Sequence, residues 1–148
     1  MNAKKILCPV DFSTNDEAAF ATAASLARDT GATVLILQVE EPPLAYGAGH
    51  LYYGDPDPTR DDLREMLEAV KPEGPGIPYE HRLTTGDPAG AIVREAEAEK
   101  VDVVVMSTHG RTGLGRLLMG SVAEAVVRRA SCPVLTVKHP KPGPDRSK

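Results

Sequence analysis

The chain has 148 residues with 41% hydrophobic and 26% charged residues, so its length suits one domain and its composition excludes a wholly disordered chain. The formal net charge of -4, without a long basic run before the tail, argues against general binding to nucleic acid or to an anionic membrane. No apolar segment approaches the roughly 18 residues that span a bilayer, and Cys8 and Cys132 lack a metal-type spacing, so we expect a cytoplasmic protein with two buried, reduced thiols.

The first elements alternate between strand and helix patterns. Apolar runs at 4–10 and 33–39 predict strands that are buried on both faces of a sheet. Between them, alanines at helical spacing predict a helix that Ser13 or Asn15 caps and that Gly31 ends. Strand, helix and strand together indicate a βαβ unit.

The middle of the chain begins with a segment rich in proline and glycine, 41–59, which predicts a flexible loop rather than a domain linker. A helix at 61–70 and a strand at 79–84 follow. Asp87 as N-cap, with a proline directly after it, predicts a helix over 88–98.

Two further strands, at 102–106 and 133–137, flank a helix at 121–130. The polar, proline-rich tail 139–148 is expected to be disordered. Residues 1–138 are therefore expected to form one Rossmann-like α/β domain, with a doubly wound, mostly parallel five-stranded sheet and helices on both faces.

The chemistry of such a sheet lies at the carboxyl ends of its strands, where the strand order reverses. Here the first strand ends in Pro9-Val10-Asp11 and the fourth in Met106-Ser107. Glycines cluster after the fourth strand, where backbone N–H groups of a glycine-rich turn can form a nest for an anion.

A helix is expected to start beside this nest, at Gly120-Ser121, and it adds free N–H groups, a hydroxyl and the positive end of the helix dipole. Arg111 and Arg116 lie within reach, as phosphate clamps or as solvated surface charges. The residues therefore favour phosphate binding, while a plain glycine-rich turn with a serine cap stays the alternative. Because there is no GxxxxGK[ST] and no glycine in the first βα turn, a P-loop NTPase and a Rossmann dinucleotide site are both poorly supported.

Three segments carry a strong resemblance to universal stress proteins: STHGRTG at 107–113, GSVAE at 120–124 and CPVLTV at 132–137. The opening ILCPVDFS at 6–13 and the Val39-Glu40 strand end are similar to that family too, so the likeness covers nearly the whole chain up to the tail. It implies binding of ATP, or of ADP or AMP, with Mg²⁺ if a triphosphate is bound.

The resemblance also implies a role for each site residue. Asp11 resembles the acid that contacts ribose, and helix capping is its alternative role. Pro9, Val10, Val39 and Met106 resemble the walls of the adenine pocket, although the same side chains would serve equally as core. The phosphate side is expected to comprise Ser107, Gly110, Arg111, Gly113, Gly120, Ser121 and Val122.

Ser107 departs from the family's pattern of Gly, two residues, Gly, nine residues, then Gly and Ser or Thr, which Gly110 and Gly120-Ser121 fit. If position 107 requires a positive φ, a serine costs roughly 1 kcal/mol or more. If glycine only allows a phosphate to approach closely, serine fits and can donate its hydroxyl.

The function that follows is an ATP-binding regulatory or adaptor protein of the stress response. The family also suggests a homodimer through the last strand, 133–137, whose apolar edge needs cover. A ligand-free dimerisation module and a slow ATP hydrolase are the alternatives. No catalytic residue is assigned, because no motif positions a base and His109 is expected to make a structural hydrogen bond.

Overall fold

The structure, a computed structural model of the chain, describes residues 1–41, 59–109 and 119–138. Almost all of the loop expected at 41–59 and the whole tail expected at 139–148 lie outside the described residues. So do three residues of the expected phosphate side, namely Gly110, Arg111 and Gly113.

The described strands form one five-stranded sheet in the order β3-β2-β1-β4-β5, and every strand pair is parallel. The sheet was expected to be mostly parallel. The strands are β1 (Lys5–Val10), β2 (Thr33–Glu40), β3 (Tyr79–Thr85), β4 (Val103–Ser107) and β5 (Val134–Val137). All of them lie within one residue of their predicted bounds.

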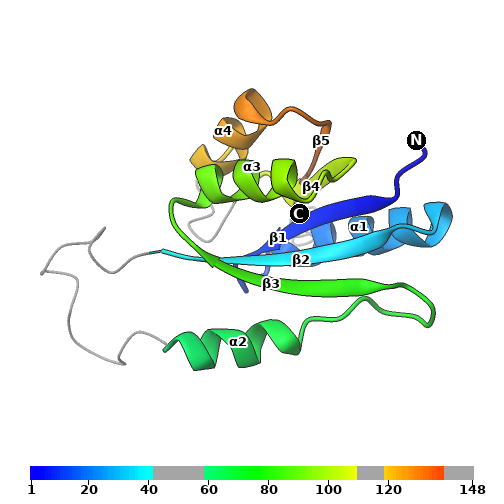
Figure 1. Cartoon of the computed structure of the whole chain (residues 1–148), viewed down its shortest axis with the longest axis horizontal. Helices are drawn as coiled ribbons and strands as arrows, with labels where there is room; N and C mark the ends of the chain where they lie inside the picture. The colour runs from blue at the N-terminus through cyan, green and yellow to red at the C-terminus, as the bar shows by residue number, and fades with distance from the viewer. Residues whose placement is uncertain (42–58, 110–118, 139–148) are drawn as a thin grey trace, which may run out of the picture.

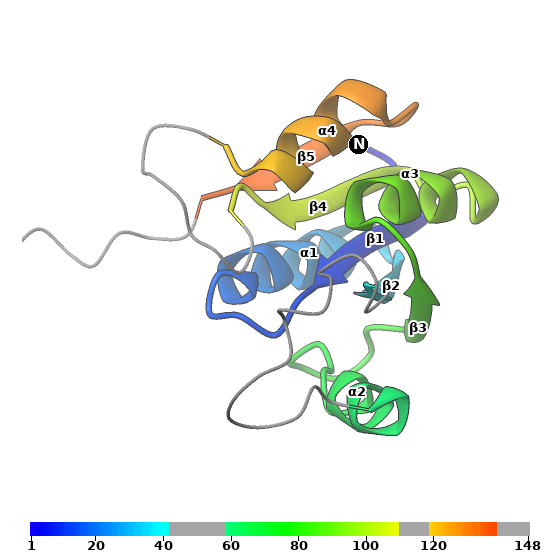
Figure 2. The same ribbon diagram turned by 90° about the vertical axis from the view of Figure 1, so that its left-hand side faces the viewer.

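Within the described ranges, four helices cover the two faces of the sheet, which confirms the doubly wound fold. They are α1 (Asp16–Thr30), α2 (Arg60–Glu68), α3 (Pro88–Ala98) and α4 (Ser121–Arg129). Seen along the strands, α1 and α2 lie on one side of the sheet, and α3 and α4 lie on the other (Figure 2). The strand order reverses between β1 and β4, so the switch point of the sheet lies at their carboxyl ends (Figure 1).

The core consists of two apolar layers, one on each face of the sheet. Alternate strand residues point to opposite faces, so Ile36 packs beneath α1 whereas its neighbour Leu37 packs beneath α3 and α4. The helices contribute mainly small residues, such as Ala23 of α1 and Ala96 of α3. Alanines let a helix approach the sheet closely, which suits a chain with only 4% aromatic residues.

The helix ends follow the sequence signals at three of four tested positions. Asp87 accepts a hydrogen bond from Gly90 N and caps α3, which confirms its predicted role. Gly31 ends α1 in the left-handed region, with φ 77°. Ser121 is the first residue of α4, as predicted. The predicted cap of α1 was wrong: Asn15 precedes the helix in a helical conformation and its side chain makes no capping hydrogen bond, while Ser13 accepts only from Asn15 N.

The end of α1 allows a test of the backbone argument. We expect Gly31→Ala to lower the free energy of unfolding by about 1 kcal/mol, because a Cβ is disfavoured at a positive φ. The space around Gly31 is open, so no steric clash adds to this cost. Gly31→Asn is the matched control and should cost less, since asparagine tolerates this region. Urea unfolding measures both, and equal losses for the two variants would contradict the explanation.

Candidate functional site

The hydrogen-bond pairing between β1 and β4 stops before their carboxyl ends, and we attribute this to Pro9. Lys4 O accepts from Thr33 N of β2, whereas Lys5 O accepts from Asp102 N just before β4, so the odd-numbered residues of β1 face β4. The β1–β4 register ends at Leu7↔Val104. The next residue on that edge is Pro9, which has no N–H to donate to β4. Pairing with β2 continues to the end of β1, so a gap in the hydrogen-bond ladder lies at the switch point of the sheet.

The turn after β1 is stabilised by the side chain of Asp16, the first residue of α1. Asp16 Oδ2 accepts from Asp11 N at 2.8 Å and from Phe12 N at 2.7 Å. Phe12 lies in the left-handed region with φ 65°, a conformation that a bulky residue rarely adopts. Asp11 Oδ1 accepts from Ser13 N at 2.9 Å, so the expected ribose-binding carboxylate lies in an Asx turn at the strand end.

The carboxylates of Asp11 and Asp16 lie close together in this turn, and the pKa of Asp16 is raised. Burial, and secondly the neighbouring Asp11 carboxylate, raise the pKa of Asp16 from its ordinary value of 3.8 to about 7. The two backbone N–H donors oppose this shift but do not cancel it. Asp16 therefore changes its charge near neutral pH while it supports the turn that presents Asp11.

The end of β4 answers the question that Ser107 raised. Among the described residues other than glycine, positive φ occurs only at Phe12 and Lys100, so serine at 107 carries no left-handed strain. Its hydroxyl donates to His109 O at 2.6 Å and stabilises the turn. His109 Nδ1 lies 3.2 Å from Thr108 Oγ1, a hydrogen bond consistent with the structural role expected of this histidine.

The start of α4 lies against the same turn, since Gly120 N donates to Thr108 O at 2.7 Å. Gly120 is the N-cap residue in an extended conformation, and within the described residues no side chain caps the helix. By contrast, Thr59 caps α2 and Asp87 caps α3 through side-chain oxygens. Within the described residues, the first amides of α4, including those of Ser121 and Val122, therefore lack the capping side chain that α2 and α3 have, as those of α1 do.

The expected pocket walls lie at this edge, but their side chains point to opposite faces. Val10 is buried in the layer beneath α1 and α2, and Met106 in the layer beneath α3 and α4. Val39 packs against the second layer. Val10 and Met106 are thus core residues and Val39 is partly buried against the core, and contact of all three with a ligand stays a prediction.

The backbone of Val39 faces the switch point. Thr33 N donates toward β1 and Val34 N donates to Pro78 O on the β3 side, so the odd-numbered residues of β2 face β1. β1 ends opposite Gln38, one residue before Val39. Val39 O accepts a hydrogen bond from the side chain of Gln38, with Nε2 at 3.2 Å.

The sequence reasoning missed Asp16 and Gln38. Asp16 could have been suspected, because an acidic residue in the first turn of α1 follows a strand that itself ends in Asp11. Gln38 is the one polar residue in the apolar run VLILQV and is buried. A polar residue in such a run signals a partner or a function, since burying an amide is costly.

Other site types find no support in the described part of the chain. No three His, Cys, Asp or Glu side chains there lie close enough together to hold a metal ion. None of the described helices is long and apolar enough to cross a membrane. Both cysteines are free thiols, with Cys8 buried as expected and Cys132 only half-buried.

Comparison with known proteins identifies relatives of the whole described fold. The model of the universal stress protein family matches residues 2–138. A universal stress protein of Methanocaldococcus jannaschii is 37% identical over 142 residues, which cover 93% of this chain and 84% of that protein. A solved universal stress protein from Archaeoglobus fulgidus in complex with dAMP is 26% identical with a TM-score of 0.66, and covers 93% of this chain and 100% of that chain. A different solved universal stress protein, in complex with cAMP, is 25% identical with a TM-score of 0.67, and the match covers 93% of this chain and 98% of that chain.

The raised pKa of Asp16 predicts a pH-dependent stability. The folded protein holds this proton more tightly than the unfolded chain does, so the contribution is complete below about pH 4 and is lost as the pH rises through about 7. We expect Asp16→Asn, which keeps an acceptor oxygen and cannot titrate, to lack this loss. Its unfolding free energy relative to the wild type should rise between about pH 4 and pH 7 and then level off.

Urea unfolding at several pH values measures the difference, and Asp16→Ala is the control. Alanine also removes the acceptor for two backbone N–H groups, so it should destabilise the protein by about 1–3 kcal/mol relative to Asp16→Asn. A difference between wild type and Asp16→Asn that is the same at every pH would show that Asp16 does not titrate in this range.

Proposed function

The chain belongs to the universal stress protein family, and we propose that it binds an adenine nucleotide at the carboxyl ends of β1 and β4. ATP is the ligand that we propose first, with ADP and AMP as alternatives. Mg²⁺ would come with the phosphates of a triphosphate, as it commonly does in nucleotide sites. The observation that carries the proposal is the start of α4, which no side chain of the described residues caps and which lies beside the gap between two strand ends.

The phosphates are assigned to the start of α4. Backbone amides in the first turn of a helix, together with the positive end of its dipole, attract anions. Gly120 presents no side chain in front of these amides, and Ser121 adds a hydroxyl. The bond from Gly120 N to Thr108 O keeps the helix start against the end of β4.

The nucleoside is assigned to the ends of β1 and β2. Asp11 supplies a carboxylate at the end of β1, where ribose hydroxyls can donate to it. Val39 offers its backbone along the edge that β1 no longer covers. The dAMP and cAMP complexes of related universal stress proteins support an adenine nucleotide as the ligand class.

We propose a regulatory or adaptor role in the stress response, in the cytoplasm, rather than catalysis. The two candidate bases near the site, His109 and Asp11, already make structural hydrogen bonds. The His109 ring lies against Thr108 Oγ1, and the Asp11 carboxylate accepts from Ser13 N. A slow hydrolase would need one of these groups to leave its partner.

Gly120→Asp separates phosphate binding from helix stability. An aspartate here would cap α4 with its own carboxylate, so we expect the melting temperature to stay the same or to rise slightly. The same carboxylate would occupy the amides and repel a phosphate, so the Kd for ATP should rise at least about tenfold. Calorimetry with ATP and Mg²⁺ measures the change.

Adenosine, which has no phosphate, is the control ligand for this variant. Its affinity for Gly120→Asp should match its affinity for the wild type. An unchanged Kd for ATP would place the phosphates elsewhere, and a wild type that does not bind ATP at millimolar concentration would refute the proposed function.

The proposal includes a homodimer through 133–137. β5 is an edge strand of the sheet, and edge strands expose unpaired backbone groups. Leu135 is 42% exposed on this strand, and Val127 of the neighbouring α4 is 47% exposed. A shallow hollow between β5 and α1, of about 370 Å³, is lined by Leu135 and by residues of α1 including Thr22 and Leu26. A second copy would cover this apolar edge.

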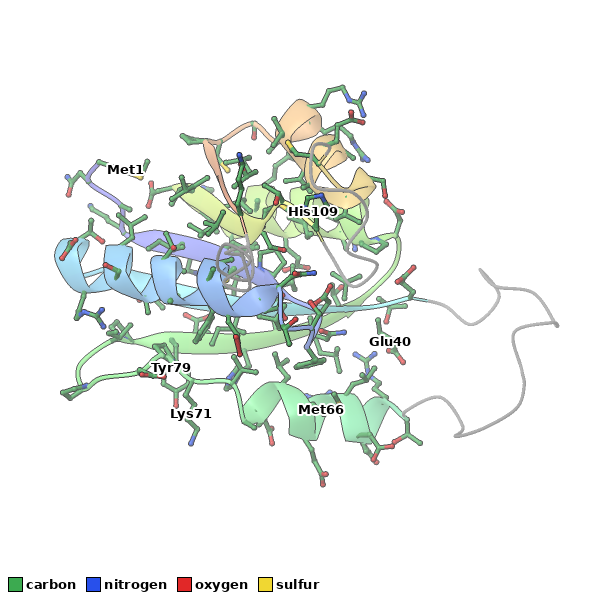
Figure 3. All side chains as sticks on the ribbon, turned by 180° about the vertical axis from the view of Figure 1, so that it is seen from behind. Met1, Glu40, Met66, Lys71, Tyr79 and His109 are labelled. Atoms are coloured by element: carbon green, nitrogen blue, oxygen red, sulfur yellow. The ribbon has the colours of Figure 1, made fainter. Side chains whose placement is uncertain are left out.

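Leu135→Glu tests the dimer. A charge on the apolar edge should raise the dimer dissociation constant at least about tenfold, because a buried unpaired carboxylate is costly. Light scattering over a dilution series measures the mass. Met66→Glu is the matched control, since Met66 is also 42% exposed but lies on α2, away from β5 (Figure 3). A wild type that is monomeric at tens of micromolar would refute the dimer.

A further inference from the structure

Gln38 is a buried amide near the carboxyl end of β2, one residue before the backbone assigned to the base. The residue is only 4% exposed. Its Nε2 donates to Val39 O, and its Oε1 is buried without a hydrogen-bond partner. It is the only buried side-chain oxygen or nitrogen of the described residues in this state. Such a group costs about 1–3 kcal/mol, so its presence calls for an explanation.

The surroundings of Gln38 make an apolar residue the simpler choice for stability. Its register partners are Val10 of β1 and Leu83 of β3, and both belong to the apolar layer on the α1 and α2 face. A methionine has a similar length and volume and would fill the same space without an unpaired oxygen. The amide therefore has no packing advantage that would offset its cost.

The position of the amide links it to the switch point. Glu40 lies two residues further along β2, and Figure 3 shows it toward the same end of the sheet as His109, with Tyr79 toward the opposite end. The bond between Gln38 Nε2 and Val39 O places the amide beside the carbonyl that faces the end of β1. The terminal torsion of a glutamine is soft, so Oε1 can turn toward the strand end without a movement of β2.

We propose that Gln38 is a specificity-determining residue whose Oε1 accepts a hydrogen bond from the 6-amino group of a purine. The inference rests on the proposed nucleotide site and names the feature by which that site selects the base. Val39 O has a second lone pair, so Val39 O and Gln38 Oε1 form a pair of adjacent acceptors. An exocyclic amino group carries two hydrogens and matches this pair, whereas the 6-oxo group of hypoxanthine or guanine is itself an acceptor and is repelled.

The chemistry explains why a buried oxygen without a partner inside the protein is useful in a binding site. A site that is built to hydrogen-bond one group discriminates strongly against an analogue that lacks it, because the polar atom of the protein then stays unpaired. Burial strengthens this discrimination, because a solvent-exposed amide could replace a missing hydrogen bond to the base with one to water at little cost.

Binding of ATP and of inosine triphosphate, which differs at position 6 of the base, tests the proposal. We expect the wild type to bind ATP at least about tenfold more tightly than inosine triphosphate. Gln38→Met should reduce this ratio to about threefold or less, and its melting temperature should be equal to or higher than that of the wild type. Gln38→Leu repeats the test with a different apolar shape, so that a packing defect in one variant does not decide the result. Leu83→Met changes packing beside Gln38 and should leave the ratio as it is in the wild type.

The outcomes separate this inference from the function on which it rests. A wild type that binds neither nucleotide refutes the nucleotide site itself. A wild type that binds ATP and inosine triphosphate equally, or a Gln38→Met variant that is stable and keeps the full preference for ATP, overturns the role of Gln38 alone and leaves the site intact.

Discussion

Each inner strand of a parallel sheet forms backbone hydrogen bonds with two neighbours. Beyond Leu7, however, β1 pairs with β2 and no longer with β4. On the β2 side pairing reaches Val10, but on the β4 side Pro9 has no N–H to offer. Because of the strand order, this gap in the hydrogen-bond ladder lies between β1 and β4, where the order reverses. The even-numbered residues of β1 thus keep the strand paired with β2, while Pro9 leaves its end unpaired on the β4 side.

The turn that follows β1 is held by polar interactions that carry a cost of their own. Phe12 adopts a left-handed conformation, which costs of order 1–3 kcal/mol for a residue of this kind. Asp16 offsets the cost through two backbone hydrogen bonds, but it must then lie beside Asp11 in a half-buried position, which raises its pKa. The arrangement keeps the Asp11 carboxylate at the strand end in a defined turn. Rigid support of this kind is what a contact with a ribose would need.

Much of the fold could be predicted from the sequence, because the strands are apolar runs and the helices show clear periodicity and end signals. The sequence did not predict the strand order, which the structure shows and which places the switch point between β1 and β4. Less of the site could be predicted, because its contacts join residues that no local pattern relates. The support of Phe12 by Asp16 depends on where α1 begins, and the opposite faces of Val10 and Met106 depend on the register of each strand. The conformation of Ser107 is set by the turn that its own hydroxyl stabilises, and spacing alone could not reveal it.

Three departures from local rules lie at the carboxyl edge of the sheet. Among the residues that the structure describes, Phe12 is left-handed, Gln38 buries an unpaired oxygen, and Gly120 starts a helix without a side-chain cap. The other left-handed residue besides glycine in the described part of the chain, Lys100, follows α3 at the opposite edge. The carboxyl edge itself does not force these exceptions, because α3 begins at the same edge after β3 and is capped by Asp87 in the ordinary way. Exceptions that gather around the β1–β4 gap, while an adjacent βα turn obeys the rules, are expected where stability is given up for binding. Each of the three offers a different chemical group: a supported carboxylate at the end of β1, the oxygens Val39 O and Gln38 Oε1 on β2, and amides at the start of α4 that no described side chain caps. Taken in space from β2 through β1 to α4, these groups would complement an exocyclic amine, a ribose hydroxyl and a phosphate, which is the order of base, sugar and phosphate in an adenine nucleotide.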